Sequence, residues 1–250
     1  MKSAFELRHQ ISNTSRELHA RGWVANHDGN VSHRLPRGAG FLITPTAISK
    51  RDTKAEGLAA VSLAGEPTGR QKPPSEVQLH VGAYRARAEV MAVIHAHPPE
   101  ASAFALAGRS LGPIAMPEVV VSLGAELPLV PLLLPKDPSS AAQVEEALRY
   151  ADAALLSGNG VITAGVDLEQ ALLRMELVEH YAKILSRALA LGSPVRPLSD
   201  DALAKLLDMR AKAGLVVRPQ GAPAAAKPKA TGALRSIVTE EVRRALGGKS

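Results

Sequence analysis

Residues 92–99 read AVIHAHPP, an apolar run that ends in two histidines and two prolines. The apolar run predicts a buried strand, which we expect to span residues 90–97. Side chains two positions apart on a strand point to the same face of the sheet, so the rings of His95 and His97 are aimed at one spot. Two converging imidazoles are typical of a metal site, and two buried histidines satisfied by hydrogen bonds are the other interpretation.

Helical and strand signals follow one another along the chain, separated by turns rich in glycine and proline. The strands nearest the N-terminus are expected to form a hairpin, because the linking sequence PRGAG favours a tight turn. We expect helices over residues 3–21, 75–87, 99–110, 139–151, 167–191 and 199–214, strands around 30–35, 40–44 and 90–97, two short strands within 153–165, and strand material in 117–133.

The composition limits the class of protein. The chain has 250 residues, of which 46% are hydrophobic, enough for one compact domain with a full core. It contains no cysteine, so a metal ion would depend on histidine and oxygen ligands. The N-terminal segment lacks the apolar core of a signal peptide, and no apolar run is long enough to cross a membrane. These features predict a cytoplasmic protein without a membrane partner.

The chain divides into a body and a basic tail. We expect a main domain over residues 1–195, a C-terminal helix over 196–214, and a Pro/Ala/Lys-rich linker with a basic tail over 215–250. The formal net charge is +6, and residues 221–250 carry a net +4 of it. The charges of the tail are dispersed and no aromatic residue lies among them for base stacking, so we expect no nucleic-acid partner.

Polar residues upstream of the histidines supply further candidates. Glu76 stands at the start of the helix expected over 75–87, with Ser75 in the N-cap position. A carboxylate here serves as a metal ligand or a general base, or it answers the helix dipole. His80, one turn further along, is interpreted as a packed helical histidine. Two loops, together with Ser75, suggest an anionic pocket; they are DGNVS at 28–32 and TPT at 44–46.

Five motifs follow one another in order: GNVS at 29–32, LITPT at 42–46, PPSE at 73–76, AVIHAHPP at 92–99 and LLSGNGV at 155–161. With these motifs the chain resembles the class II aldolase/adducin family over residues 5–190. The resemblance implies an α/β fold, a three-layer α/β/α sandwich with a largely antiparallel central sheet. It also implies a small-molecule substrate and a homotetramer with active sites at the subunit interfaces.

The same resemblance implies roles for single residues. His95 and His97 ligate a divalent cation, commonly zinc, and Glu76 is the acid or base that can also approach the metal. A pocket for a substrate phosphate or carboxylate is lined by the Gly29 amide, Asn30, Thr46 and Ser75. A cation chelated by a carbonyl and an adjacent hydroxyl acts as a Lewis acid while a carbon–carbon bond breaks, and it stabilises the enediolate left behind.

The chain departs from the family pattern at the third metal ligand. The family takes a third histidine from the block that here reads SGNGV, where this chain has Asn159. A neutral amide oxygen is a poorer zinc ligand than imidazole. We expect His95, His97, Glu76 and Asn159 to hold zinc, with manganese or cobalt as alternatives. A site that holds no metal, as in the non-enzymatic adducin branch, is the other interpretation.

Further departures concern the substrate. Pro74 stands where sugar-phosphate aldolases carry a serine, Ala47 where they carry a glycine, and Val121 aligns with the tyrosine that protonates their leaving group. These changes make a carboxylate-bearing or unphosphorylated substrate credible. We therefore expect a lyase that performs aldol-type cleavage of a hydroxy-carbonyl compound. The alternatives are a metal-dependent decarboxylase of a hydroxylated aromatic dicarboxylate and a non-catalytic, adducin-like binding protein.

Overall fold

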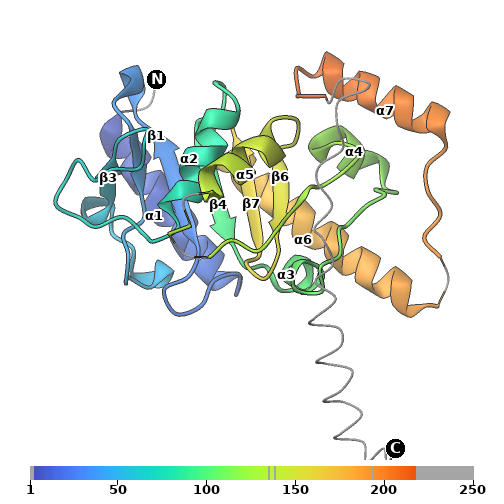
Figure 1. The fold of residues 1–250 in the computed structure, drawn as a ribbon, viewed down its shortest axis with the longest axis horizontal. Coiled ribbons are helices and arrows are strands. Elements are labelled where there is room, and N and C mark those ends of the chain that lie inside the picture. The colour runs from blue at the N-terminus through green and yellow to red at the C-terminus, as the bar shows by residue number, and fades with distance from the viewer. Residues whose placement is uncertain (1–2, 135, 138, 193, 218–250) are drawn as a thin grey trace, which may run out of the picture.

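The computed structural model describes residues 3–134, 136, 137, 139–192 and 194–217, so the tail expected from residue 215 lies, from residue 218 onward, outside the described residues. Within them, seven strands form one sheet in the order β3-β2-β1-β4-β7-β6-β5, with β4 at its centre (Figure 1). The strands are β1 (Asn30–Arg34), β2 (Phe41–Ile43), β3 (Ala59–Val61), β4 (Ala92–Ala96), β5 (Leu129–Val130), β6 (Ala153–Leu156) and β7 (Val161–Gly165).

The sheet is mixed. Among the described strands, β5 pairs with β6 in parallel, and the other five pairings are antiparallel. The expected hairpin is present, because β1 and β2 pair antiparallel across a short 3₁₀ helix, η1 (Pro36–Gly38). The central strand β4 lies between β1 and β7, where His95 is opposite Asn30 on one side and Ile162 on the other. Both neighbours of β4 thus lead into loops at the histidine end.

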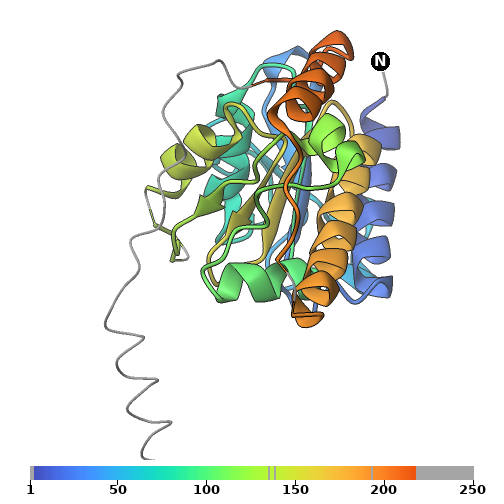
Figure 2. The same ribbon diagram turned by 90° about the vertical axis from the view of Figure 1, so that its right-hand side faces the viewer.

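Helices cover both faces of this sheet (Figures 1 and 2). The helix α1 and the long helix α6 pack on one face, and α2 and α5 pack on the other. None of the described helices is both long and apolar enough to span a membrane. The helices are α1 (Ala4–Ala20), α2 (Val77–Ala86), α3 (Pro99–Leu106), α4 (Pro117–Leu123), α5 (Ser140–Leu148), α6 (Leu168–Ala190) and α7 (Asp200–Lys212), with short 3₁₀ helices η2 (Lys50–Asp52) and η3 (Ala55–Gly57).

The alternation along β4 decides which face holds the histidines. Ile94 belongs to the core on the α1/α6 face, and Val93 belongs to the core on the α2/α5 face. His95 is two residues from Val93 and therefore shares its face. The central strand thus directs His95 towards α2, the helix that begins directly after Glu76.

One expectation from the sequence is wrong. Residues 117–123, expected as strand material, form the helix α4, and only Leu129–Val130 of the segment 117–133 forms a strand. The buried side chains Val119, Val120 and Leu123 have a helical spacing, and Pro117 occupies the first helical position. The β-branched run was the misleading signal, because packing on one face overrides the strand preference of valine.

The expected C-terminal helix is present as α7. Its N-cap is Ser199, whose hydroxyl accepts a hydrogen bond from the backbone N–H of Ala202. The helix packs beside α4 (Figure 1). Its Arg210 is fully buried and donates to the carbonyl oxygens of Val121 and Val216 at 2.8 and 2.7 Å. A buried arginine therefore joins this helix to the main domain.

The same arginine belongs to a buried ion cluster around Asp152, the residue before β6. Asp152 is 1% exposed and pairs with Arg87 at 2.6 Å, with Arg174 at 3.0 Å and with Arg210. The three guanidinium groups come from the end of α2, from α6 and from α7. One carboxylate thus fixes three helices to the start of β6.

Neutralising this carboxylate should destabilise the whole fold. We expect Asp152→Asn to lower the free energy of unfolding by about 3–5 kcal/mol, because it leaves three buried cations without their counter-charge. Urea denaturation measures the change. The matched control is Asp208→Asn, which removes an exposed carboxylate paired with Lys212 and should change the stability by less than about 0.5 kcal/mol. Equal stabilities of the two variants would contradict a structural role for the cluster.

Candidate active site

The end of β4 brings the two histidines together. His95 is fully buried on the strand, and His97 follows the strand, with its backbone N–H donating to the carbonyl oxygen of Trp23 at 2.8 Å. The two ring centroids lie 5.1 Å apart. The expectation that both rings approach one spot is therefore met, although His97 lies one residue beyond the strand itself.

Glu76 faces these rings from the start of α2. Its Oε2 lies 3.5 Å from His95 Nε2 and accepts a hydrogen bond of 2.9 Å from the side-chain amide of Asn30. Its Oε1 accepts a hydrogen bond of 2.8 Å from the side-chain amide of Asn159. The carboxylate is thus held at both oxygens by neutral donors from two different parts of the sheet.

Two glycines allow the loops to come this close to β4. Gly29 has φ +70°, and a Cβ on it would lie 3.0 Å from the carbonyl oxygen of His95. Gly160 has φ +71°, and a Cβ there would lie 2.4 Å from the Ala96 carbonyl oxygen and 2.6 Å from Cδ2 of His97. A side chain at either position would force the loop away from the histidines.

The hydrogen bonds of the two rings define their tautomers. His95 Nδ1 lies 3.0 Å from the carbonyl oxygen of Val161, and His97 Nδ1 lies 3.0 Å from Oδ2 of Asp28. Both partners can only accept when Asp28 is ionised, so each Nδ1 carries the hydrogen. Each neutral ring then turns the lone pair of Nε2 inward. Metal-ligating histidines show this pattern, in which the outer nitrogen donates to a carbonyl or carboxylate.

Both inward nitrogens are unsatisfied. The Nε2 atoms of His95 and His97 are buried and make no hydrogen bond within the described part of the chain. A buried polar atom without a partner costs about 1–3 kcal/mol. Two such lone pairs beside the carboxylate of Glu76 suit a cation. No group of three or more His, Cys, Asp or Glu side chains with metal-binding geometry occurs among the described residues, since the third position here is the amide of Asn159.

The charges around the site favour a positive species between His95 and Glu76. Burial of Glu76 would raise its pKa, but the neighbouring His95 and the hydrogen bonds from Asn159 and Asn30 hold that pKa far below the usual value for a carboxyl group. Burial of His95 would lower its pKa, but the charge of Glu76 raises it. Burial and the charge of His95 lower the pKa of His97. Glu76 is therefore ionised, as a metal ligand or a base must be.

The structure places the expected anion-binding residues less closely together. Ser75 is exposed and is not the N-cap of α2; that position is Glu76, whose side chain makes no capping bond. Glu76 turns instead to Asn30 and Asn159, because their amides and His95 offer it stronger partners. Ser75 lines a cleft of about 10 Å³ with Glu76 and Asn159. Thr46 is exposed, and its backbone N–H donates to the carbonyl oxygen of Lys72.

Two charged residues near the site have no predicted role. Asp28 bonds to His97, and its position next to Gly29 in the DGNVS loop was the available signal. Lys50 is 2% exposed, and its ammonium donates to the carbonyl oxygens of His27 and Ile48 at 2.9 and 3.2 Å. Burial lowers the pKa of Lys50, while Asp28 and Glu76 oppose this shift. Nothing in the local sequence around Lys50 announces its burial.

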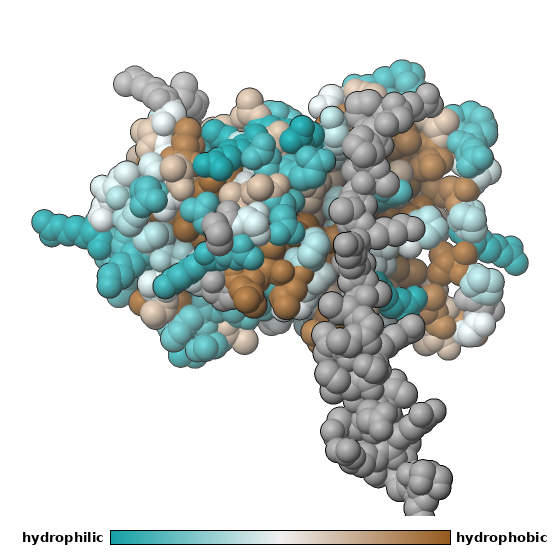
Figure 3. All heavy atoms as spheres, in the orientation of Figure 1, coloured by the Kyte–Doolittle hydropathy of each residue, from teal (hydrophilic) through white to brown (hydrophobic). Residues whose placement is uncertain are grey.

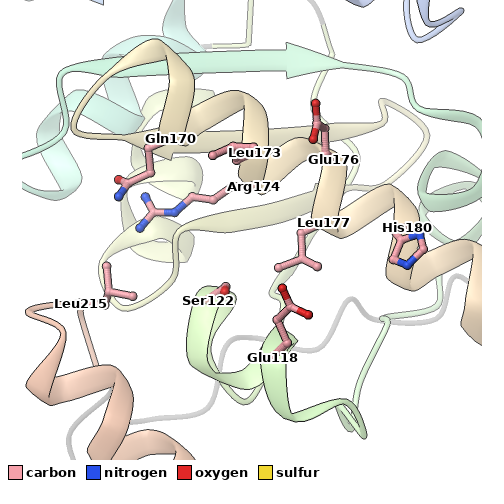
Figure 4. A pocket seen from close by; sticks show the side chains of 9 residues that line it. All are labelled: Glu118, Ser122, Gln170, Leu173, Arg174, Glu176, Leu177, His180 and Leu215. Atoms are coloured by element: carbon pink, nitrogen blue, oxygen red, sulfur yellow. The ribbon is translucent and has the colours of Figure 1, made fainter.

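A cavity of about 480 Å³ lies elsewhere, between α4, α6 and the segment after α7 (Figure 4). The side chains of Gln170, Leu173 and Arg174 on α6 line it, and Glu118 and Ser122 of α4 stand opposite. It shares no lining residue with the group formed by Glu76 and the two histidines. Its size therefore gives no information about that group.

His80 lies buried behind the site, as its interpretation as a packed histidine requires. Its Nδ1 is 2.6 Å from the hydroxyl of Ser32, which is also 2.6 Å from the hydroxyl of Tyr84. Ser32 lies on β1, and His80 and Tyr84 lie on α2. This cluster fastens the helix that begins after Glu76 to the strand that carries Asn30.

Comparisons with known proteins agree with this geometry. Residues 9–186 match the family model described as the class II aldolase and adducin N-terminal domain. The L-fuculose phosphate aldolase of Escherichia coli K12 is 30% identical over 203 residues, 81% of this chain and 93% of that protein. The 3-oxo-tetronate 4-phosphate decarboxylase of the same organism is 31% identical over 205 residues, 80% of this chain and 94% of that protein.

A solved structure supports the same relationship. The crystal structure of YgbL from Escherichia coli superposes with a TM-score of 0.74 at 30% sequence identity. The match covers 82% of this chain and 99% of that chain. The similarity therefore extends over most of the described fold.

The buried His80 predicts a dependence of stability on pH. Burial and the charge of His95 lower the pKa of His80 from 6.5 to about 3. Between these values the unfolded chain binds a proton that the folded chain excludes, so stability is full above pH 6.5 and falls as the pH is lowered, by up to about 1.4 kcal/mol for each pH unit. We expect His80→Gln, which keeps a partner for Ser32, to show a shallower loss than the wild type when urea denaturation is repeated from pH 7 to pH 5. Parallel pH profiles would contradict this account.

Proposed function

The chain belongs to the class II aldolase and adducin family, and on this basis we propose that it is a divalent-metal-dependent carbon–carbon lyase. The observation that carries the proposal is the pair of buried, unpartnered Nε2 atoms on His95 and His97 beside the ionised Glu76. Two imidazoles and a carboxylate form a donor set that suits zinc, with manganese or cobalt as alternatives. The carbonyl oxygen of the Asn159 amide is the fourth donor that we propose.

A bound divalent cation would supply Lewis acidity to a substrate that presents a carbonyl and an adjacent hydroxyl. The protein would then have to orient the substrate and move one proton. Glu76 is the group that we assign to the proton. Asn30 holds its Oε2 and Asn159 holds its Oε1, so the carboxylate has a defined direction before the substrate arrives.

We assign the recognition of a substrate phosphate or carboxylate to the loops that flank the site. The backbone N–H of Gly29, the side chains of Thr46 and Ser75, and Asn30 are the groups proposed for this role. The position of Ser75 beside Glu76 and Asn159 supports it for one of these groups. The substrate class that follows is a small hydroxy-carbonyl compound with an anionic group.

Aldol cleavage is the reaction that we favour, and decarboxylation is the second candidate. Similarity to a protein named as a 3-oxo-tetronate 4-phosphate decarboxylase, at 31% identity, supports the second candidate as directly as similarity to an aldolase supports the first. Both reactions break a carbon–carbon bond next to a carbonyl and leave electrons on oxygen. A hydroxylated aromatic dicarboxylate is the further substrate class considered for decarboxylation.

We also propose that the protein works as a homo-oligomer, a tetramer being the state expected from the family. The cleft beside Glu76 is too small for a substrate in the single chain. Leu132 and Leu134 on the loop after β5 are 61% and 64% exposed, and Leu134 lines this cleft. Figure 3 shows apolar areas among the polar ones on this face of the molecule. A neighbouring subunit that covers these leucines would enlarge and enclose the site.

Metal uptake tests the proposed ligands. We expect the purified wild-type protein to bind zinc, and His95→Ala and His97→Ala each to weaken binding by more than about 100-fold, since removing a ligand costs more than removing an outer partner. Competition with a chromophoric chelator measures the affinities. His180→Ala, which removes an exposed histidine of α6, is the matched control. A wild-type protein that takes up no divalent cation would favour the adducin-like alternative.

Product analysis separates the two reactions. We expect the zinc-loaded protein to cleave at least one member of a panel of L-fuculose 1-phosphate, 3-oxo-tetronate 4-phosphate and a hydroxylated aromatic dicarboxylate. An aldehyde product without carbon dioxide supports aldol cleavage, and released carbon dioxide supports decarboxylation. Glu76→Gln should lower kcat by about 10²- to 10⁴-fold, whereas Glu146→Gln, at an exposed pair with Arg149, should leave it unchanged. A Glu76→Gln variant with wild-type kcat would exclude the proton role.

A further inference from the structure

We propose that Asp28 is a positioning residue, which fixes the tautomer and direction of the His97 ring so that its Nε2 can bind the metal. The proposal rests on the metal site proposed above. It starts from the distance of 3.0 Å between Oδ2 of Asp28 and Nδ1 of His97. The two side chains are 32% and 31% exposed, so the contact is only partly screened by water.

The carboxylate of Asp28 is itself held in place. Its Oδ1 accepts a hydrogen bond of 2.5 Å from the backbone N–H of Ala25, and its own backbone N–H donates to the carbonyl oxygen of Ala25 at 3.0 Å. Each oxygen therefore has one N–H partner, Ala25 for Oδ1 and His97 for Oδ2. This arrangement differs from an exposed ion pair between two long side chains, in which neither partner is fixed.

The loop that carries Asp28 is tied down on both sides. Before it, the carbonyl oxygen of Trp23 accepts the backbone N–H of His97 at 2.8 Å. On the other side, Lys50 binds the carbonyl oxygen of His27, and Gly29 packs against the backbone of His95. The position of Asp28 relative to the His97 ring is thus set by the fold, before any metal binds.

Asp28 gives His97 a property that His95 lacks. The outer nitrogen of His95 faces a neutral carbonyl oxygen, whereas that of His97 faces a carboxylate. An anionic acceptor holds the Nδ1–H tautomer more firmly and makes Nε2 a stronger donor to a cation. At the third ligand position this chain has the neutral Asn159 in place of an imidazole. We infer that the charge of Asp28 offsets part of the affinity that this exchange removes.

The variant Asp28→Asn tests the proposal with little change of shape. The asparagine amide has one acceptor oxygen where the carboxylate has two, so it cannot accept from both Ala25 and His97. If the oxygen stays with Ala25, the amide N–H₂ faces His97 and selects the tautomer with hydrogen on Nε2, which blocks metal binding. We expect the zinc affinity to fall by about 10- to 100-fold, the loss typical of an outer partner of a histidine ligand.

Two measurements decide the outcome. Competition with a chromophoric chelator gives the zinc affinity of wild type, Asp28→Asn and the control Asp208→Asn, which loses the same charge at an exposed site. Nitrogen-15 NMR of the histidine rings in the metal-free proteins gives the tautomer of His97, which a merely structural substitution would not change. We expect the Nδ1–H form in the wild type and a shift towards the Nε2–H form in Asp28→Asn only.

The results separate this inference from the proposed function. If the wild type binds zinc, and Asp28→Asn binds it within about two-fold with an unchanged His97 tautomer, the role of Asp28 is wrong and the metal site stands. If the wild type binds no zinc, the proposed function is wrong. The tautomer of His97 then still decides the contact, since an Nε2–H ring in the metal-free wild type would also overturn the role of Asp28.

Discussion

The geometry of the site depends on a partly buried carboxylate that needs partners. Glu76 lies at the start of α2, and its side chain is only 20% exposed. An ionised carboxylate in such a position is stable only when it is hydrogen-bonded or paired. Its partners come from β1, from β4 and from the turn between β6 and β7. One charge therefore sets the distance between the helix and three strands, and it does so at the end of the sheet where both histidines lie.

Two other buried polar groups support this arrangement from behind. The cluster of Ser32, His80 and Tyr84 fastens α2 to β1. The cluster around Asp152 fastens the end of α2, with α6 and α7, to the start of β6, and the turn after β6 carries Asn159. Buried polar groups tolerate few alternative arrangements, since each lost partner costs free energy. The scaffold can therefore hold Glu76, His95 and Asn159 in place without a bound ion.

The family relationship and the local geometry explain different properties of the protein. Membership in the class II aldolase and adducin family accounts for the fold and for the carbon–carbon lyase chemistry of its relatives. The amide at position 159 accounts for what is particular to this chain. It donates to Glu76, a role that a neutral histidine bound to a metal does not fill in the same way, and it leaves only two imidazoles at the site. The additional carboxylate of Asp28 on the outer side of His97 belongs to the same local difference.

The sequence by itself determined the features that depend on local spacing and capping. The period of two places His95 and His97 on one side of the chain, the helix begins directly after Glu76, and Ser199 caps α7 as its position predicts. Local signals failed where packing decides: the valines of α4 suggested a strand, and Glu76 displaced Ser75 from the N-cap. Only the tertiary structure decided that Asp152 gathers three arginines, that Lys50 is buried and that Asp28 meets His97. These partners are far apart in the sequence, and their contacts are set by how helices and strands pack, which no local period encodes.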